Sequence, residues 1–249
     1  MIKSILSIVC LSSLTFLPLR ASVDYPLSAK EGIEWCDIWL PHANQTNLPH
    51  VLMIGDSITR AYYPMVEKQL AGTAYVDRLA TSAFIADPML LSEIKLVLDS
   101  QKYDVIQFNN GLHGASHPVA EYRTAFPKLL ATIREHARGA KLIWANTTPL
   151  KTGEYATAGE PVAATDKGVE AGRLMLRSDL TGQSNARIRA LNAIALECVK
   201  PLGIPVVDLN TPMVGHPEYH NGNIHFNAQG MKIQADMVAA EVRSVLKSP

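Results

Sequence analysis

The sequence has few of the features that mark nucleic-acid-binding, metal-binding or repeat proteins. Its 23 basic and 23 acidic residues balance, and without a basic run neither nucleic acid nor an anionic membrane surface is an expected partner. It contains no internal repeat and no low-complexity tract. Its cysteines and histidines lack the spacing of a zinc site, and the pairs His113/His117 and His216/His220 lie in Gly- and Pro-rich loops. We therefore expect no metal and no other cofactor.

Only one long apolar run is present, and it lies at the N-terminus. Residues 1–21 combine an early Lys3, an apolar stretch over 5–19 and a small residue at Ala21, which is the pattern of a secretory signal peptide. The run is short for a membrane span and contains Pro18, although a short anchoring helix is an alternative. We expect a periplasmic or secreted protein that does not insert into the membrane after cleavage.

Cysteine is scarce in the remaining chain, where only Cys36 and Cys198 occur. Export would permit a disulfide between them. However, Cys198 lies on an apolar stripe at helical spacing and can equally be a buried thiol. The sequence leaves both alternatives open.

Apolar strands alternate with amphipathic helices from residue 50 to residue 249. This order predicts a single α/β domain with a parallel sheet and helices on both faces. The expected strands are 51–54, 74–76, 104–108, 141–146 and 204–209. Residues 22–49 are expected to form an irregular N-terminal segment, and the polar stretch 147–181 a long excursion over the carboxyl edge of the sheet.

Ser57 follows a strand of consecutive apolar residues, 51–54, and precedes a helix expected over 59–70. This places it at the carboxyl edge of the sheet, where open α/β folds bind ligands. The N–H groups of the helix start favour negative charge nearby. A serine in this position can also be a simple helix N-cap.

Three other segments are expected at the same edge: the loops 78–88 and 109–114 and the segment 221–227. The last of these carries His225 just before the final helix, which must pack beside the first strand for His225 to approach Ser57. A serine needs a base to take its proton, and histidine is the usual base near neutral pH. The attack also creates an oxyanion that needs fixed donors.

These residues resemble the SGNH (GDSL-type) hydrolases, a family with secreted bacterial members. The blocks that carry the resemblance are Gly55-Asp56-Ser57, the loop Phe108-Asn109-Asn110-Gly111-Leu112-His113, and His225 before the last helix. It implies a three-layer α/β/α sandwich of flavodoxin-like type with a five-stranded parallel sheet. It also implies Ser57 as nucleophile, His225 as base and Asn109 as oxyanion donor, with Asn110 as the fallback.

Two positions depart from the family pattern. A glycine whose N–H joins the oxyanion hole is replaced by Ala83, which follows Ser82. The aspartate that normally stands three residues before the histidine is replaced by Gly222. A main-chain carbonyl near Gly222 is the favoured substitute for orienting His225, and the side chains of Asn221 and Asp208 are the alternatives.

Several further residues have both a functional and an ordinary interpretation. Ser184 lies in a turn similar to the nucleophile turn of some sialic-acid esterases, but no apolar strand precedes it, so we expect a helix N-cap. Arg60 and His113 are possible substrate contacts.

The resemblance implies a secreted serine esterase that acts through an acyl-enzyme and removes acetyl groups from carbohydrate. The expected partner is a small-molecule or polysaccharide ester, and the sequence does not define the oligomeric state. A lipid or small-acyl esterase such as a lysophospholipase is one alternative. A catalytically inactive glycan-binding relative is another, because Gly222 stands in the aspartate position.

Overall fold

Strand β2 (His50–Gly55) forms the centre of the sheet. It pairs in parallel with β3 (Tyr75–Thr81) on one side and with β4 (Val105–Phe108) on the other. Every residue of β4 and all but the first of β2 are buried. Continuous burial is typical of parallel strands that are covered by helices on both faces.

The computed structural model describes residues 30–151 and 184–248. The expected signal peptide, 1–21, and most of the expected excursion over 147–181 lie outside these residues. β5 (Lys141–Ala145) and the two-residue β6 (Val206–Val207) complete the row of parallel strands. The strand order is β1-β3-β2-β4-β5-β6, so the five parallel strands that the sequence predicts are confirmed.

The sheet has one strand more than predicted. β1 (Cys36–Trp39) pairs antiparallel with β3 and lies in the segment 22–49, which we expected to be irregular. β3 also runs on to Thr81, whereas only 74–76 was predicted as strand. β3 pairs with β2 as far as Ala80, and its second half also gains β1 as a partner on its outer side. Four residues of mixed character do not reveal such an edge strand.

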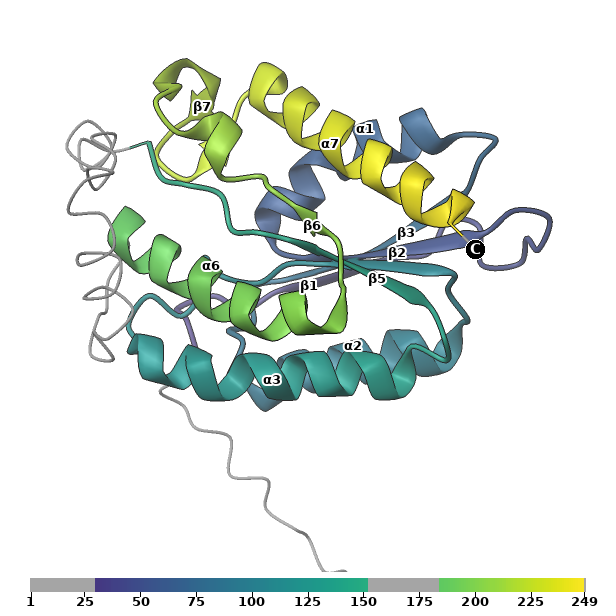
Figure 1. The fold of residues 1–249 in the computed structure, drawn as a ribbon, viewed down its shortest axis with the longest axis horizontal. Coiled ribbons are helices and arrows are strands. Elements are labelled where there is room, and N and C mark those ends of the chain that lie inside the picture. Colours follow the sequence, from purple (N-terminus) through teal and green to yellow (C-terminus); the bar gives the residue numbers. More distant parts are fainter. Residues whose placement is uncertain (1–29, 152–183, 249) are drawn as a thin grey trace, which may run out of the picture.

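Helices cover both faces of the sheet, as predicted (Figure 1). α1 (Ser57–Leu70) and α7 (Ala228–Lys247) lie side by side on one face. α2 (Pro88–Ser100), α3 (Val119–His136) and α6 (Asn185–Val199) lie on the other. Since α7 packs against α1, the segment before α7 reaches the turn at which α1 begins.

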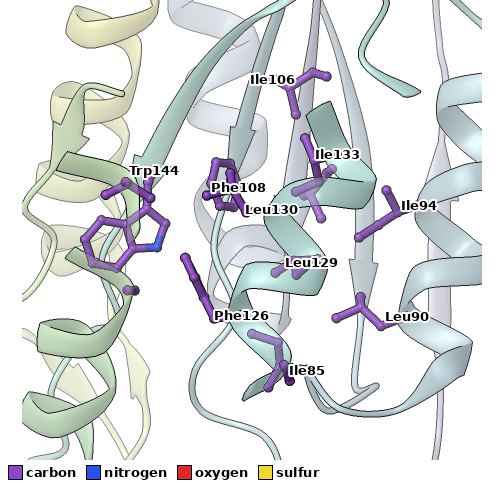
Figure 2. Packing of buried hydrophobic residues seen from close by; sticks show 14 of the residues in the cluster. Ile85, Leu90, Ile94, Ile106, Phe108, Phe126, Leu129, Leu130, Ile133 and Trp144 are labelled. Carbon is purple, nitrogen blue, oxygen red and sulfur yellow. The ribbon is translucent and has the colours of Figure 1, made fainter. Parts of the chain in front are cut away.

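Two hydrophobic clusters hold the layers together, one on each face. Figure 2 shows the cluster under α2 and α3, where Phe126 lies between Phe108 and Trp144. The Phe126 ring is 6.3 Å from each of these two rings, centroid to centroid. Aromatic pairs at such separations add to the free energy of apolar burial, so this cluster fixes the strand ends that carry the 109–114 loop.

The thiols of Cys36, on β1, and Cys198, on α6, are free and form no disulfide. Within residues 30–151 and 184–248, no helix combines the length and the apolar character that a membrane crossing requires.

Candidate active site

Ser57 is the first residue of α1, directly after the buried strand β2. The Oδ1 atom of Asp56 accepts the Ile58 N–H at 2.9 Å and caps the helix. Gly55 has to be glycine here, because a Cβ atom would lie 2.1 Å from the Thr59 hydroxyl oxygen. The turn is therefore tight, and it leaves the half-buried Ser57 side chain at the carboxyl edge of the sheet.

His225 lies in a small hairpin made by β7 (His220–Asn221) and β8 (His225–Phe226). Gly222 allows the tight connection because its φ is +75°, a region that other residues rarely occupy. On the far side, Asn227 caps α7 by accepting the N–H groups of residues 229 and 230. His225 is thus fixed in the chain by a hairpin on one side and a helix start on the other.

The structure brings Ser57 and His225 together, although they are 168 residues apart in the chain. The Nε2 atom of His225 lies 3.0 Å from the Ser57 Oγ atom, within hydrogen-bond distance. With the proton on Nδ1, Nε2 can accept the serine proton, which is the arrangement that an activated serine requires.

None of the three candidate orienters hydrogen bonds to His225 in the part of the chain that the structure describes. Among residues 30–151 and 184–248, the only hydrogen bond of the His225 ring is the one between Nε2 and Ser57, so the group that orients His225 stays a prediction. Asp208 instead accepts hydrogen bonds from the Asn146 side chain at 2.7 Å and from the Thr211 N–H at 3.0 Å. Burial alone would raise the pKa of Asp208, but these hydrogen bonds outweigh it and lower the pKa. Asp208 therefore stabilises its own turn.

The Ala83 N–H, which was expected to donate to the oxyanion, donates to a neighbouring side chain in the structure. The Ala83 N–H donates to Thr81 Oγ1 at 3.1 Å, and Ala83 is fully buried. Ser82 is bound to the N-terminal segment, since its hydroxyl donates to Glu34 at 2.7 Å and accepts the Trp35 N–H at 2.8 Å. The Thr81 side chain thus closes a local turn at the end of β3 and engages the Ala83 N–H, whose role in the oxyanion hole stays a prediction.

The side-chain amides of Asn109 and Asn110 bind different parts of the chain. The Asn109 N–H donates to the Ile54 carbonyl at 3.0 Å, which places Asn109 beside the Ser57 turn, and its side-chain amide donates to the Ala145 carbonyl at 2.6 Å. The Asn110 amide donates to the Ala83 carbonyl at 3.2 Å. Asn109 also lines a small cavity together with residues 58 and 59 of α1. Each side-chain amide has a second N–H that these bonds leave available. Asn109 lies beside the start of α1, so its second N–H is the better placed of the two to serve Ser57.

The other predicted residues take distinct places. Ser184 caps α6, with its hydroxyl accepting the Arg187 N–H at 3.1 Å, so the prediction of a cap is confirmed. The Nδ1 atom of His113 lies 3.1 Å from the Oε1 atom of Glu31. Arg60 packs against Trp35 beside the Ser57 turn. No cluster of three or more potential metal ligands occurs among the residues that the structure describes.

Sequence reasoning missed the part that residues 30–35 play in the site. Glu31, Glu34 and Trp35 bind the loops that follow β3 and β4. The only signal was the presence of Trp35 and Trp39 in a segment that otherwise lacks a pattern.

We expect His220, in the hairpin that carries His225, to make the stability of the fold depend on pH. It is buried against Phe226, and burial, followed by the charge of Lys151, lowers the pKa of His220 below the ordinary 6.5. His220 in the unfolded chain then binds a proton more readily than His220 in the folded protein. The free energy of unfolding is therefore highest above about pH 6.5 and decreases as the pH falls toward the lowered pKa of the folded state. We expect the melting temperature to fall less between pH 7.5 and pH 5 in His220→Gln than in the wild type. Parallel pH curves would contradict this assignment.

Comparisons with known proteins identify the family and the fold. Residues 53–233 match the model of the GDSL-like lipase/acylhydrolase family. A comparison with curated proteins finds no match.

Solved structures share the fold at low sequence identity. A carbohydrate esterase of family 3 from Talaromyces cellulolyticus has a TM-score of 0.57 at 14% identity, covering 81% of this chain and 100% of its own. A serine-to-alanine mutant of an acetyl esterase with an acetate ion has a TM-score of 0.57 at 15% identity, covering 80% and 98%. A member of the lipolytic G-D-S-L family from Veillonella parvula has a TM-score of 0.52 at 16% identity, covering 79% and 98%.

Proposed function

Because the chain belongs to the GDSL-like lipase/acylhydrolase family, we propose that it hydrolyses esters with Ser57 as nucleophile and His225 as base. The observation that carries this proposal is the 3.0 Å contact between Ser57 Oγ and His225 Nε2. Hydrogen-bond contact between a serine and a histidine is the signature of an activated nucleophile.

The proposed reaction has two halves. Ser57 Oγ attacks the ester carbonyl and transfers its proton to His225 Nε2, which then protonates the leaving alcohol as the acyl-enzyme forms. In the second half, a water gives its proton to His225 Nε2 as it attacks the acyl carbon. The bond between Ser57 Oγ and the acyl group then breaks, His225 returns the proton to Ser57, and the carboxylic acid leaves. The Ser57 N–H at the start of α1 and the Asn109 side chain stabilise the oxyanion in both halves.

We propose that the acyl group is acetyl and that the alcohol is a carbohydrate. We also propose that the enzyme acts outside the cytoplasm. Two proteins of similar fold are named a carbohydrate esterase and an acetyl esterase, which supports this substrate class. The expected signal peptide over 1–21 supports export. Release of acetate from acetylated polysaccharides, compared between the wild type and Ser57→Ala, tests the assignment.

A second candidate function is glycan binding without catalysis. It is favoured by the lack of a hydrogen-bonded partner for Nδ1 of His225 among the described residues. Turnover of an acetyl ester no faster than that of Ser57→Ala, with glycan binding retained, would support it.

Mutation can distinguish which of the two asparagines of the 109–114 loop serves as the oxyanion donor. Asn109→Ala should lower turnover by about 10²- to 10³-fold, the loss seen when one oxyanion donor is removed. Asn110→Ala should have a much smaller effect on turnover, because its amide braces the Ala83 loop. Steady-state kinetics on an acetyl ester, with melting temperatures as a check on folding, would measure both. A larger kinetic loss in Asn110→Ala would move the oxyanion donor to that residue.

A further inference from the structure

Trp35 and Arg60 lie against each other beside the turn that carries Ser57. The Arg60 guanidinium is 4.9 Å from the centroid of the Trp35 ring, within the range of a cation–π contact. Arg60 follows Ser57 by three positions in α1, so the two side chains leave the helix on neighbouring faces about 5–6 Å apart at Cβ. An ester held at Ser57 therefore has this pair within reach.

The backbone of Trp35 is fixed from two sides. Its N–H donates to Ser82 Oγ at 2.8 Å, and its carbonyl accepts the Ser82 N–H at 3.0 Å and the Thr81 hydroxyl at 3.1 Å. Since Cys36 pairs with Thr81, Trp35 lies just beyond the carboxyl end of β3. The backbone that carries the indole is thus held in place before any ligand binds, which reduces the entropy lost on binding.

Arg60 is oriented but remains open to solvent. Asp37 Oδ2 lies 4.0 Å from its Nη1, and 51% of the Arg60 side chain is exposed. A guanidinium carries five N–H donors, so several of them can still bind oxygen atoms of a ligand.

Acceptors stand on the same N-terminal segment. Glu31 Oε1 accepts the Gly114 N–H at 3.1 Å, and 38% of the Glu31 side chain is exposed. Glu34 lies three residues further on and accepts the Ser82 hydroxyl. Asp37 is already paired with Arg78 at 2.9 Å, so its charge is neutralised. The two carboxylates of Glu31 and Glu34 still outnumber the single guanidinium of Arg60, which disfavours a phosphate or carboxylate on the ligand.

We propose that Trp35 and Arg60 form the subsite for the alcohol part of the ester, and that this part is a neutral sugar. Arg60 covers one face of the Trp35 ring, and a sugar ring would present its C–H groups to the other face, which is negative as well. Its hydroxyls both donate and accept, which matches the carboxylates and the guanidinium. The proposal rests on the ester hydrolysis at Ser57 and deepens it by naming residues that select the alcohol.

Two acetyl esters separate this role from catalysis. Penta-O-acetylglucose carries a sugar ring, whereas triacetin carries only a glycerol chain. In Trp35→Ala we expect the ratio of kcat/KM for the sugar ester to that for triacetin to fall about tenfold, mainly through a higher KM. Arg60→Met should lower the same ratio, and because Arg60 is exposed this variant should fold even if Trp35→Ala does not.

Trp39 provides the matched control. It lies on β1 four positions after Trp35, is 53% exposed, and pairs with Arg78 at the end of β1 away from the carboxyl edge. Trp39→Ala should leave the substrate ratio at the wild-type value. Equal losses on both esters in the Trp35 and Arg60 variants, or an unchanged ratio, would overturn the subsite.

A binding measurement distinguishes failure of the subsite from failure of the proposed chemistry. Penta-O-acetylglucose titrated into Ser57→Ala should quench tryptophan fluorescence, and the added change Trp35→Phe should remove most of that quenching. Quenching by a wild-type protein that hydrolyses neither ester would refute the chemistry and support the subsite. No quenching would refute the subsite.

Discussion

Ser57→Ala is expected to lower the turnover of an acetyl ester by roughly 10⁴- to 10⁶-fold, as when the serine of a working catalytic unit is lost. The side chain at this position contacts His225 and caps nothing, since Asp56 accepts the Ile58 N–H in its place. The substitution removes one oxygen atom from a half-buried position and should leave the melting temperature almost unchanged.

Ser184→Ala is the control for this prediction. Ser184 also stands at a helix start, but its hydroxyl accepts the Arg187 N–H, so its loss should cost about 1 kcal/mol of stability and little turnover. Steady-state rates and thermal melts of both variants would test the pair. The reverse pattern would mean that the site has been assigned to the wrong serine.

His225→Ala is expected to lower turnover by a similar factor, roughly 10⁴- to 10⁶-fold, because serine and base act as a unit. For the same reason, the double variant with Ser57→Ala should be no slower than either single variant. His225 is exposed and belongs to a two-residue strand, so the fold should survive the change. Additive losses in the double variant would contradict a shared step.

Asp208→Asn tests whether the Asp208 carboxylate orients His225 or whether a main-chain carbonyl near Gly222 does so. In the structure the carboxylate binds Asn146 and Thr211 and forms no bond with His225, so the variant should keep most of its turnover. A loss of about 10⁴-fold with an unchanged melting temperature would show that Asp208 completes a triad during the reaction.

Gly222 shows why the missing aspartate is not easily restored. A Cβ atom at this position would meet open space, but the φ of +75° strains any residue with a side chain. The hairpin of β7 and β8 requires that conformation to bring residue 225 to Ser57. An aspartate at 222 would therefore have to strain or remodel the hairpin that positions the histidine.

Local patterns in the sequence were enough to predict the centre of the fold and the contact at its edge. β2 is a run of buried residues followed by glycine, and α7 has its apolar residues at helical spacing. These two elements determine where Ser57 and His225 lie once α7 packs beside α1.

Features that depend on partners distant in the sequence could not be predicted. β1 has no strong pattern and becomes a strand only because β3 offers an unpaired edge. Similarly, nothing local indicates that Trp35 would lie against Arg60.

The central claim, that His225 activates Ser57 as a nucleophile, is tested most directly by labelling with a fluorophosphonate. Such a reagent forms a covalent bond with an activated serine, and peptide mass spectrometry then locates the label. We predict a single label on Ser57 in the wild-type protein, strongly reduced labelling in His225→Ala, and undiminished labelling in Asp208→Asn. A label on Ser184, or equal labelling of Ser57 with and without His225, would contradict the account.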